Sequence, residues 1–100
     1  MREWMGRAAV LIGLVLLPSV AAAQTVDGLA VACMSCHGVD GRSQGATPSL
    51  AGTNTQVLAD ALKAFATGAR RGTIMNFLVK AYSDDQIAAL AAYFGAKPEC

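Results

Sequence analysis

The residues with the clearest chemical potential form one short motif, Cys33-Met34-Ser35-Cys36-His37. The pattern C-x-x-C-H is typical of covalent haem attachment. Two cysteines three residues apart near the end of a helix can each form a thioether with a vinyl group of one porphyrin. The adjacent histidine can then present a ring nitrogen to the iron from the same side. The motif therefore predicts one haem c, with its iron, held by Cys33 and Cys36 and ligated by His37.

Three other interpretations of the motif are weaker. A thioredoxin-like dithiol requires a strand before the motif and a helix after it, whereas the glycine-rich segment 38–52 follows here. A zinc site needs four ligands, and the chain has three cysteines and one histidine, two of them adjacent. A structural disulfide between Cys33 and Cys36 would leave His37 without a role.

The sixth iron ligand is predicted to be Met75. His37 is the only histidine, which excludes a second imidazole from this chain. Met34 lies inside the attachment motif and therefore on the wrong side of the haem, whereas the segment around Met75 can cross the opposite face. A methionine more often fills a core, and an open sixth position would suit gas binding instead. A thioether ligand favours Fe(II) and raises the potential, as expected of an electron carrier.

The elements that must position these residues are helical, and the fold class is predicted to be all-α. Apolar residues at helical spacing predict helices over about 26–34, 56–67 and 83–94, and no strand. Asn54 or Thr55 can begin the second helix and Gly68 can end it. Ser83 to Gln86 forms a capping box for the third helix. The polar segment 38–52 is too long for a simple turn, and loops of that length are usually functional or disordered.

Composition separates an N-terminal segment from the rest of the chain. Of the 100 residues 54% are hydrophobic, and 16 of these lie in residues 1–23. The remaining chain carries six basic and six acidic residues. This balance argues against nucleic acid or an anionic membrane surface as a partner, since both attract basic proteins. So small a domain buries little apolar surface on its own, and a covalent haem would supply the missing core.

Residues 1–23 are predicted to be a signal peptide, and residues 24–100 one monohaem domain. Arg2 and Arg7 precede an apolar stretch, and small residues at 21–23 fit a cleavage site. An uncleaved anchor is less favoured because the uncharged run from residue 8 to 23 is shorter than the roughly 20 residues that span a bilayer. We therefore expect export to the periplasm, with no membrane insertion after cleavage.

Three stretches carry a family resemblance: CMSCHGVDGRSQGATPSLAGT at 33–53, FATGARRGTIM at 65–75 and YSDDQIAALAAYF at 82–94. The chain resembles a small class I cytochrome c, and is similar to the cytochrome c4 and c553 group and to the haem subunit of flavocytochrome c sulfide dehydrogenase. The resemblance implies three or more short helices wrapped around one covalently attached haem, with Met75 as axial ligand.

Further contacts are implied by the same resemblance. The carbonyl of Pro48 would accept the imidazole proton of His37, and Leu50 would pack on the haem. Tyr93 and Phe94 would lie where the first and last helices cross, against Gly28 and Leu29. Arginines 42, 70 and 71 are weaker candidates for pairing with haem propionates.

The expected function is periplasmic one-electron transfer with no catalytic residue of its own. The resemblance implies a redox partner protein, in particular a flavoprotein that oxidises sulfide, so that this chain would be its electron-accepting cytochrome subunit. The alternatives are a free soluble cytochrome c in a respiratory chain and, from a different class, a haem-based gas-binding module with an open sixth position. Loss of the high potential on replacing Met75 would distinguish a carrier from a gas binder.

Overall fold

The computed structural model describes residue 13 and residues 25–99. The predicted cleavage site and Cys100 lie outside the described residues. The helices, with 3-10 turns written η, are α1 Val26–His37, η2 Val39–Gly41, α2 Thr55–Thr67, α3 Met75–Leu78, η3 Val79–Ala81 and α4 Asp84–Gly95. No strand occurs within these residues, so the predicted all-α class is confirmed. None of the helices described is long and apolar enough to cross a membrane.

The ends of α2 and α4 follow the sequence signals. The side-chain oxygen of Asn54 accepts hydrogen bonds from the backbone N–H groups of Gln56 and Val57, at 2.9 and 3.1 Å. At the other end of α2, Gly68 adopts the left-handed conformation with φ of 84°. A reciprocal capping box between Ser83 and Gln86 begins α4. Each bond satisfies a backbone group that a helix end leaves unpaired.

Two features of the helices differ from the sequence expectation. The first helix, α1, continues through the whole C-x-x-C-H motif and ends at His37, whereas the apolar spacing predicted an end near residue 34. The backbone N–H of Gly38 returns to the Met34 carbonyl at 3.0 Å and closes the helix. The second difference is α3, which was not predicted because four residues are too few to show helical periodicity.

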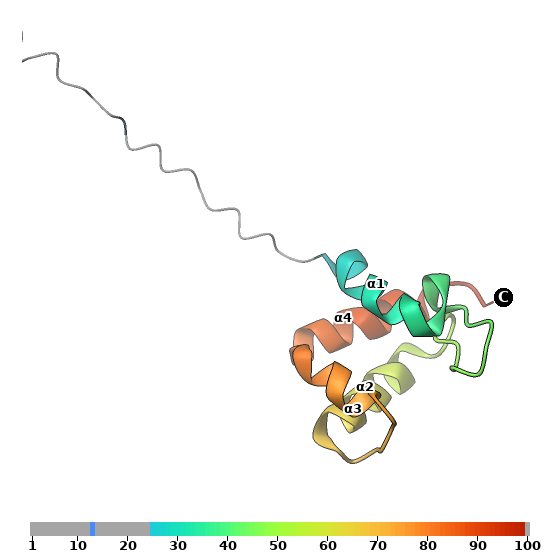
Figure 1. Cartoon of the computed structure of the whole chain (residues 1–100). Helices are drawn as coiled ribbons and strands as arrows, with labels where there is room; N and C mark the ends of the chain where they lie inside the picture. The colour runs from blue at the N-terminus through green and yellow to red at the C-terminus, as the bar shows by residue number, and fades with distance from the viewer. Residues whose placement is uncertain (1–12, 14–24, 100) are drawn as a thin grey trace, which may run out of the picture.

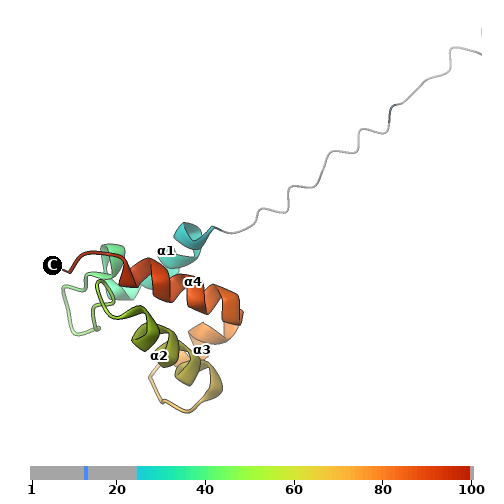
Figure 2. The ribbon, with the colours of Figure 1, turned by 180° about the vertical axis from the view of Figure 1, so that it is seen from behind.

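Helix α4 is the central element of the domain. In Figures 1 and 2 it lies between α1 on one side and the pair α2 and α3 on the other, and it contacts both α1 and α2. Ala30 of α1 and Ala91 of α4 are fully buried in the core. The other buried members of this core cluster are Leu29, Leu58, Ala59, Leu90 and Phe94. The helices therefore close around a small core, in which alanines permit close packing.

The expectations for the crossing of the first and last helices hold in part. Leu29 and Phe94 are buried in the core and Tyr93 packs against it, as the resemblance implies. The expectation for Gly28 is wrong, because this residue is exposed and an added Cβ would meet only the Thr25 hydroxyl, at 3.7 Å. A glycine is needed at a different contact, between the end of α4 and the start of α2, where an added Cβ on Gly95 would lie 3.0 Å from the Thr53 carbonyl oxygen.

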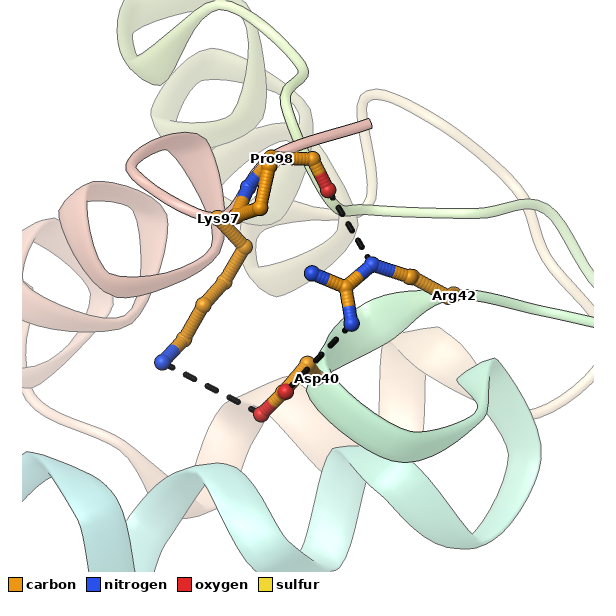
Figure 3. Close-up of polar contacts among 4 residues, drawn as sticks. All are labelled: Asp40, Arg42, Lys97 and Pro98. Carbon is orange, nitrogen blue, oxygen red and sulfur yellow. Dashed lines mark hydrogen bonds and ion pairs between the residues drawn. The ribbon is translucent and has the colours of Figure 1, made fainter. Parts of the chain in front are cut away.

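The chain after α4 returns to the segment that follows the motif. Figure 3 shows this C-terminal contact, which consists of Asp40, Arg42, Lys97 and Pro98. The Arg42 Nε donates to the Pro98 carbonyl at 3.1 Å, and its Nη1 lies 3.5 Å from a carboxylate oxygen of Asp40. The other Asp40 oxygen lies 3.9 Å from the Lys97 ammonium nitrogen. The contact therefore joins the end of the domain to η2.

Candidate functional site

His37 lies at the C-terminal end of α1 and is the one buried polar residue of the described chain, with 8% of its surface exposed. Its Nδ1 lies 2.6 Å from the carbonyl oxygen of Pro48, the contact that the resemblance implies. Because a carbonyl can only accept, Nδ1 must carry the proton, and Nε2 keeps its lone pair. This tautomer leaves Nε2 available as a metal ligand, with the ring orientation held by Pro48.

The two motif cysteines sit on the same helix as His37, and both thiols are free. Cys33 is half-buried and packs against the core cluster, whereas Cys36 is exposed. Burial raises the pKa of the Cys33 thiol, and a backbone hydrogen bond acts in the opposite direction. Residues three apart share one face of a helix, so the two sulfurs can reach one macrocycle beside His37.

The segment that carries Pro48 is held by hydrogen bonds at its base. The carbonyl oxygen of Gly41 accepts from the N–H groups of Leu50 and Ala51, at 2.7 and 3.1 Å. The Ser43 N–H donates to the Ser49 hydroxyl at 2.9 Å. Both ends of segment 41–51 are thus fixed to each other. The Pro48 carbonyl therefore faces His37 from a closed loop, and Leu50 packs against the core at its base.

Met75 is the first residue of α3 and is half-buried. The main contacts of α3 are with α2 and η3, so the structure places Met75 on a different side of α4 from the motif. Large apolar side chains close to Met75 in the sequence are exposed: Ile74, Leu78 and Phe77 are 53%, 41% and 77% exposed. Such an exposed apolar group suits contact with a large apolar ligand.

The residues present fit a covalently attached haem. They comprise two free thiols on one helix face, an imidazole with a free Nε2, a thioether, and uncovered apolar side chains near that thioether. By contrast, residues 25–99 contain no group of three His, Cys, Asp or Glu side chains able to hold a metal ion by themselves. The donor set therefore suits iron brought in by a porphyrin better than a bare metal ion.

Two of the three arginines considered for the haem propionates, Arg42 and Arg70, have other partners. Arg42 bonds to Asp40 and Pro98, and the Arg70 guanidinium lies over the Phe65 ring, 4.8 Å from its centre. Sequence reasoning missed the C-terminal contact, because its partners are far apart in the chain. It also missed the side chain of Asn76, which bonds only to backbone atoms and leaves no residue pattern to detect.

Comparison with known proteins decides the family. A cytochrome c family model matches residues 22–95, which include the motif, Pro48 and Met75. The chain belongs to the cytochrome c family. Membership implies covalent haem c with its iron, and a role in electron transfer rather than catalysis. The prediction of a class I cytochrome c fold is confirmed, as is the prediction that the chain is not an enzyme.

Individual relatives come from several bacteria. The chain is 37% identical over 67 residues to the cytochrome subunit of sulfide dehydrogenase of Chlorobaculum tepidum, covering 67% of this chain and 61% of that one. It is 43% identical over 67 residues to the thiosulfate dehydrogenase electron acceptor of Thiomonas intermedia, covering 65% and 31%. It is 38% identical over 81 residues to cytochrome c-553 of Nitratidesulfovibrio vulgaris, covering 74% and 79%. The chain thus spans less than two thirds of the first two relatives.

Proposed function

We propose that this cytochrome c is a periplasmic one-electron carrier whose haem is attached to Cys33 and Cys36 and ligated by His37 and Met75. When bound, haem c supplies reversible Fe(III)/Fe(II) exchange. The observation that carries the proposal is the arrangement at the end of α1, where two free thiols adjoin a buried imidazole whose Nδ1–H donates to Pro48. Such a hydrogen bond fixes the ring and makes Nε2 a better ligand.

Three residues of the chain, Pro48, Leu50 and Met75, have separate roles in this proposal. Pro48 holds the proton of the neutral ring on Nδ1, so that Nε2 is the nitrogen that carries the free lone pair. Leu50, at the base of this loop, packs against the core cluster, and we expect it to pack on the haem as well. Met75 offers a soft sulfur ligand that favours the reduced metal and raises the potential. Together these groups favour a carrier of high potential over a protein that binds external ligands.

A sulfide-oxidising flavoprotein is the partner that we propose. Support comes from the identity of 37% with the cytochrome subunit of sulfide dehydrogenase, although the chain spans 61% of that subunit. In this role the chain would accept electrons and leave catalysis to the other polypeptide. Because its charges balance outside residues 1–23, we expect an apolar docking contact with little salt dependence.

A free carrier is the second candidate. The chain covers 79% of cytochrome c-553 of Nitratidesulfovibrio vulgaris, a larger share than it covers of the sulfide dehydrogenase subunit. In this case the protein would move between membrane-bound donors and a terminal reductase or oxidase. Both candidates require export, and the basic and apolar segments of residues 1–23 support it.

The deciding experiment is expression of the full chain with the haem-attachment machinery. A covalent haem, a weak long-wavelength sulfur–iron band in the ferric form and poor carbon monoxide binding in the reduced form are expected. An absent band with ready carbon monoxide binding would contradict the electron carrier and favour the gas-binding module. Co-purification from the source cells then separates the partners: a stable complex with a flavin-containing subunit supports the first, and a monomer reduced by other donors supports the free carrier.

A further inference from the structure

The side chain of Asn76, next to Met75, makes three hydrogen bonds to backbone atoms. Its Oδ1 accepts from the Gly72 N–H at 2.8 Å. Its Nδ2 donates to the carbonyl oxygens of Phe65 at 2.9 Å and Arg70 at 2.7 Å. The partners determine the orientation of the amide, because reversing it would turn its oxygen toward two carbonyls and its NH₂ group toward an N–H.

These partners lie in the two regions that adjoin α3. The Phe65 carbonyl belongs to the last turn of α2, where carbonyls lack partners within the helix. Arg70 and Gly72 belong to segment 68–74, in which every residue is exposed. With no buried side chain, this segment gains little from apolar packing. The amide of Asn76 therefore ties α3 to the end of α2 and to the segment between them.

Helix α3 needs such a tie. It has four residues, far fewer than an isolated helix requires for stability in water, and no side chain caps its start. Other bonds in the connection stay close to the end of α2: the Arg70 N–H donates to the Ala64 carbonyl at 3.1 Å, and the Ala69 N–H to the Thr67 hydroxyl at 3.4 Å. Among the hydrogen bonds of the described residues, those of Asn76 link the first turn of α3, and hence Met75, to α2.

We propose that Asn76 is a positioning residue that holds the Met75 thioether in place as the sixth ligand. The inference rests on the proposed function, in which Met75 has that role. Asn76 itself does not touch the iron. It acts by keeping segment 68–76 on α2, so that the thioether remains in place and external ligands are excluded from the iron.

Two substitutions test the role in the holoprotein. N76D keeps the side-chain shape and one acceptor for Gly72, but faces the Phe65 and Arg70 carbonyls with a carboxylate oxygen. N76L removes all three bonds. One hydrogen bond can change an equilibrium by up to about tenfold, so we expect the ratio of Met75-ligated to open protein to fall by about tenfold or more in each. The readouts are the long-wavelength sulfur–iron band of the ferric form, carbon monoxide binding by the reduced form, and the midpoint potential.

The matched control is N54A, which removes the cap of α2 at the end away from Met75. N54A should lower the free energy of unfolding while keeping the band and the potential. The proposal is supported if the Asn76 variants have a weaker band, or bind carbon monoxide about tenfold more tightly, at a stability where N54A shows neither change. It is overturned if N76D and N76L match wild type in both measurements, or change only in step with N54A. Should N76L not fold, N76D carries the test.

M75A separates this inference from the proposed function. If the wild-type protein shows the band and M75A loses it, Met75 is the ligand, and the Asn76 variants test positioning alone. If the wild-type protein lacks the band and M75A behaves as wild type, the ligand assignment fails and the role of Asn76 fails with it.

Discussion

The two regions that carry the proposed iron ligands, His37 and Met75, are held in different ways. His37 is buried at the end of a twelve-residue helix, and its ring is fixed by a loop closed at Gly41 and joined to the C-terminal contact. Met75 begins a helix of four residues after a segment that is exposed throughout. The first region is therefore linked by Arg42 to the far end of the domain, whereas the second packs on α2 and is tied to it by the side-chain amide of Asn76.

This difference would suit the two proposed ligands to different roles. A residue beside the attachment cysteines belongs to a covalently anchored unit, so rigid support keeps three attachment points in register. A sixth ligand that is held locally can detach while the rest of the fold remains intact, because segments with few buried contacts open at low free-energy cost. We therefore expect damage to the His37 region to affect the whole protein, and damage to the Met75 region to affect ligand exchange first.

Removing the attachment residues should give the largest difference between variants of the His37 region and variants of the Met75 region. We expect C33S/C36S to contain no covalent haem, since no thiol of the motif remains to form a thioether, and H37A to accumulate poorly as holoprotein. M75A should keep its covalent haem and lose only the sixth ligand. Intact mass under denaturing conditions measures attachment in each variant. Covalent haem in C33S/C36S, or none in M75A, would contradict the division between the two regions.

A pair of glycines tests whether the loop beside His37 tolerates an added side chain less well than the end of α2. Gly41 and Gly68 both have positive φ, 80° and 84°. An added Cβ on Gly41 would lie 2.7 Å from Phe94 Cδ1 and 3.1 Å from the Ala51 nitrogen, whereas one on Gly68 meets nothing within 4 Å. G68A should cost about 1–2 kcal/mol of unfolding free energy from the left-handed backbone alone. G41A should cost about 1–3 kcal/mol more from overpacking.

Urea unfolding of the two holoproteins measures this difference. G68A is the control for G41A because the backbone conformation is shared and the surroundings are not. Equal losses of unfolding free energy would mean that the loop at Gly41 accommodates an added Cβ as easily as the end of α2 does. The His37 region would then not be the more rigid one.

The two regions also differ in how far the sequence reveals them. C-x-x-C-H identifies the cofactor, and short-range capping signals at Asn54 and Ser83 locate the starts of α2 and α4, because each bond joins residues a few positions apart. The end of α1 could not be located in this way. Its last turn contains Ser35 and Cys36, both exposed, and is closed by the Gly38 N–H and by the buried His37 ring.

Contacts between distant residues were harder to predict from the sequence. The bond from Arg42 to Pro98 joins positions 56 residues apart and ends on a backbone carbonyl, which no residue pattern records. Asn76 also bonds to carbonyl and N–H groups that every residue carries, so a sequence shows nothing special at its partners. The contact of His37 with Pro48 was expected only because the family resemblance implied it.

The C-terminal contact should have a smaller effect than either glycine. R42A removes the bond to Pro98 and the ion pair with Asp40, both partly exposed, so we expect a loss of about 0.5–1 kcal/mol in the free energy of unfolding. The loss should shrink in about 1 M salt, where charges are screened beyond about 3 Å. R71A is the control, since its side chain has no ion pair or hydrogen bond with the described residues. A loss no larger than that of R71A would contradict a role for this contact.

Tyr82 should give the smallest effect. It follows η3, packs against the core cluster, and has its pKa raised first by burial and then by the nearby Cys33. A thioether at Cys33 carries no charge, so in the holoprotein burial alone raises the pKa. The phenol of the unfolded chain therefore loses its proton at a lower pH than the phenol of the folded chain. As a result, the free energy of unfolding falls as the pH rises above about 10. The free energy of unfolding of Y82F should match that of wild type near neutral pH and fall less steeply in alkali. Equal slopes in urea unfolding across this range would show that burial does not raise the pKa of this phenol.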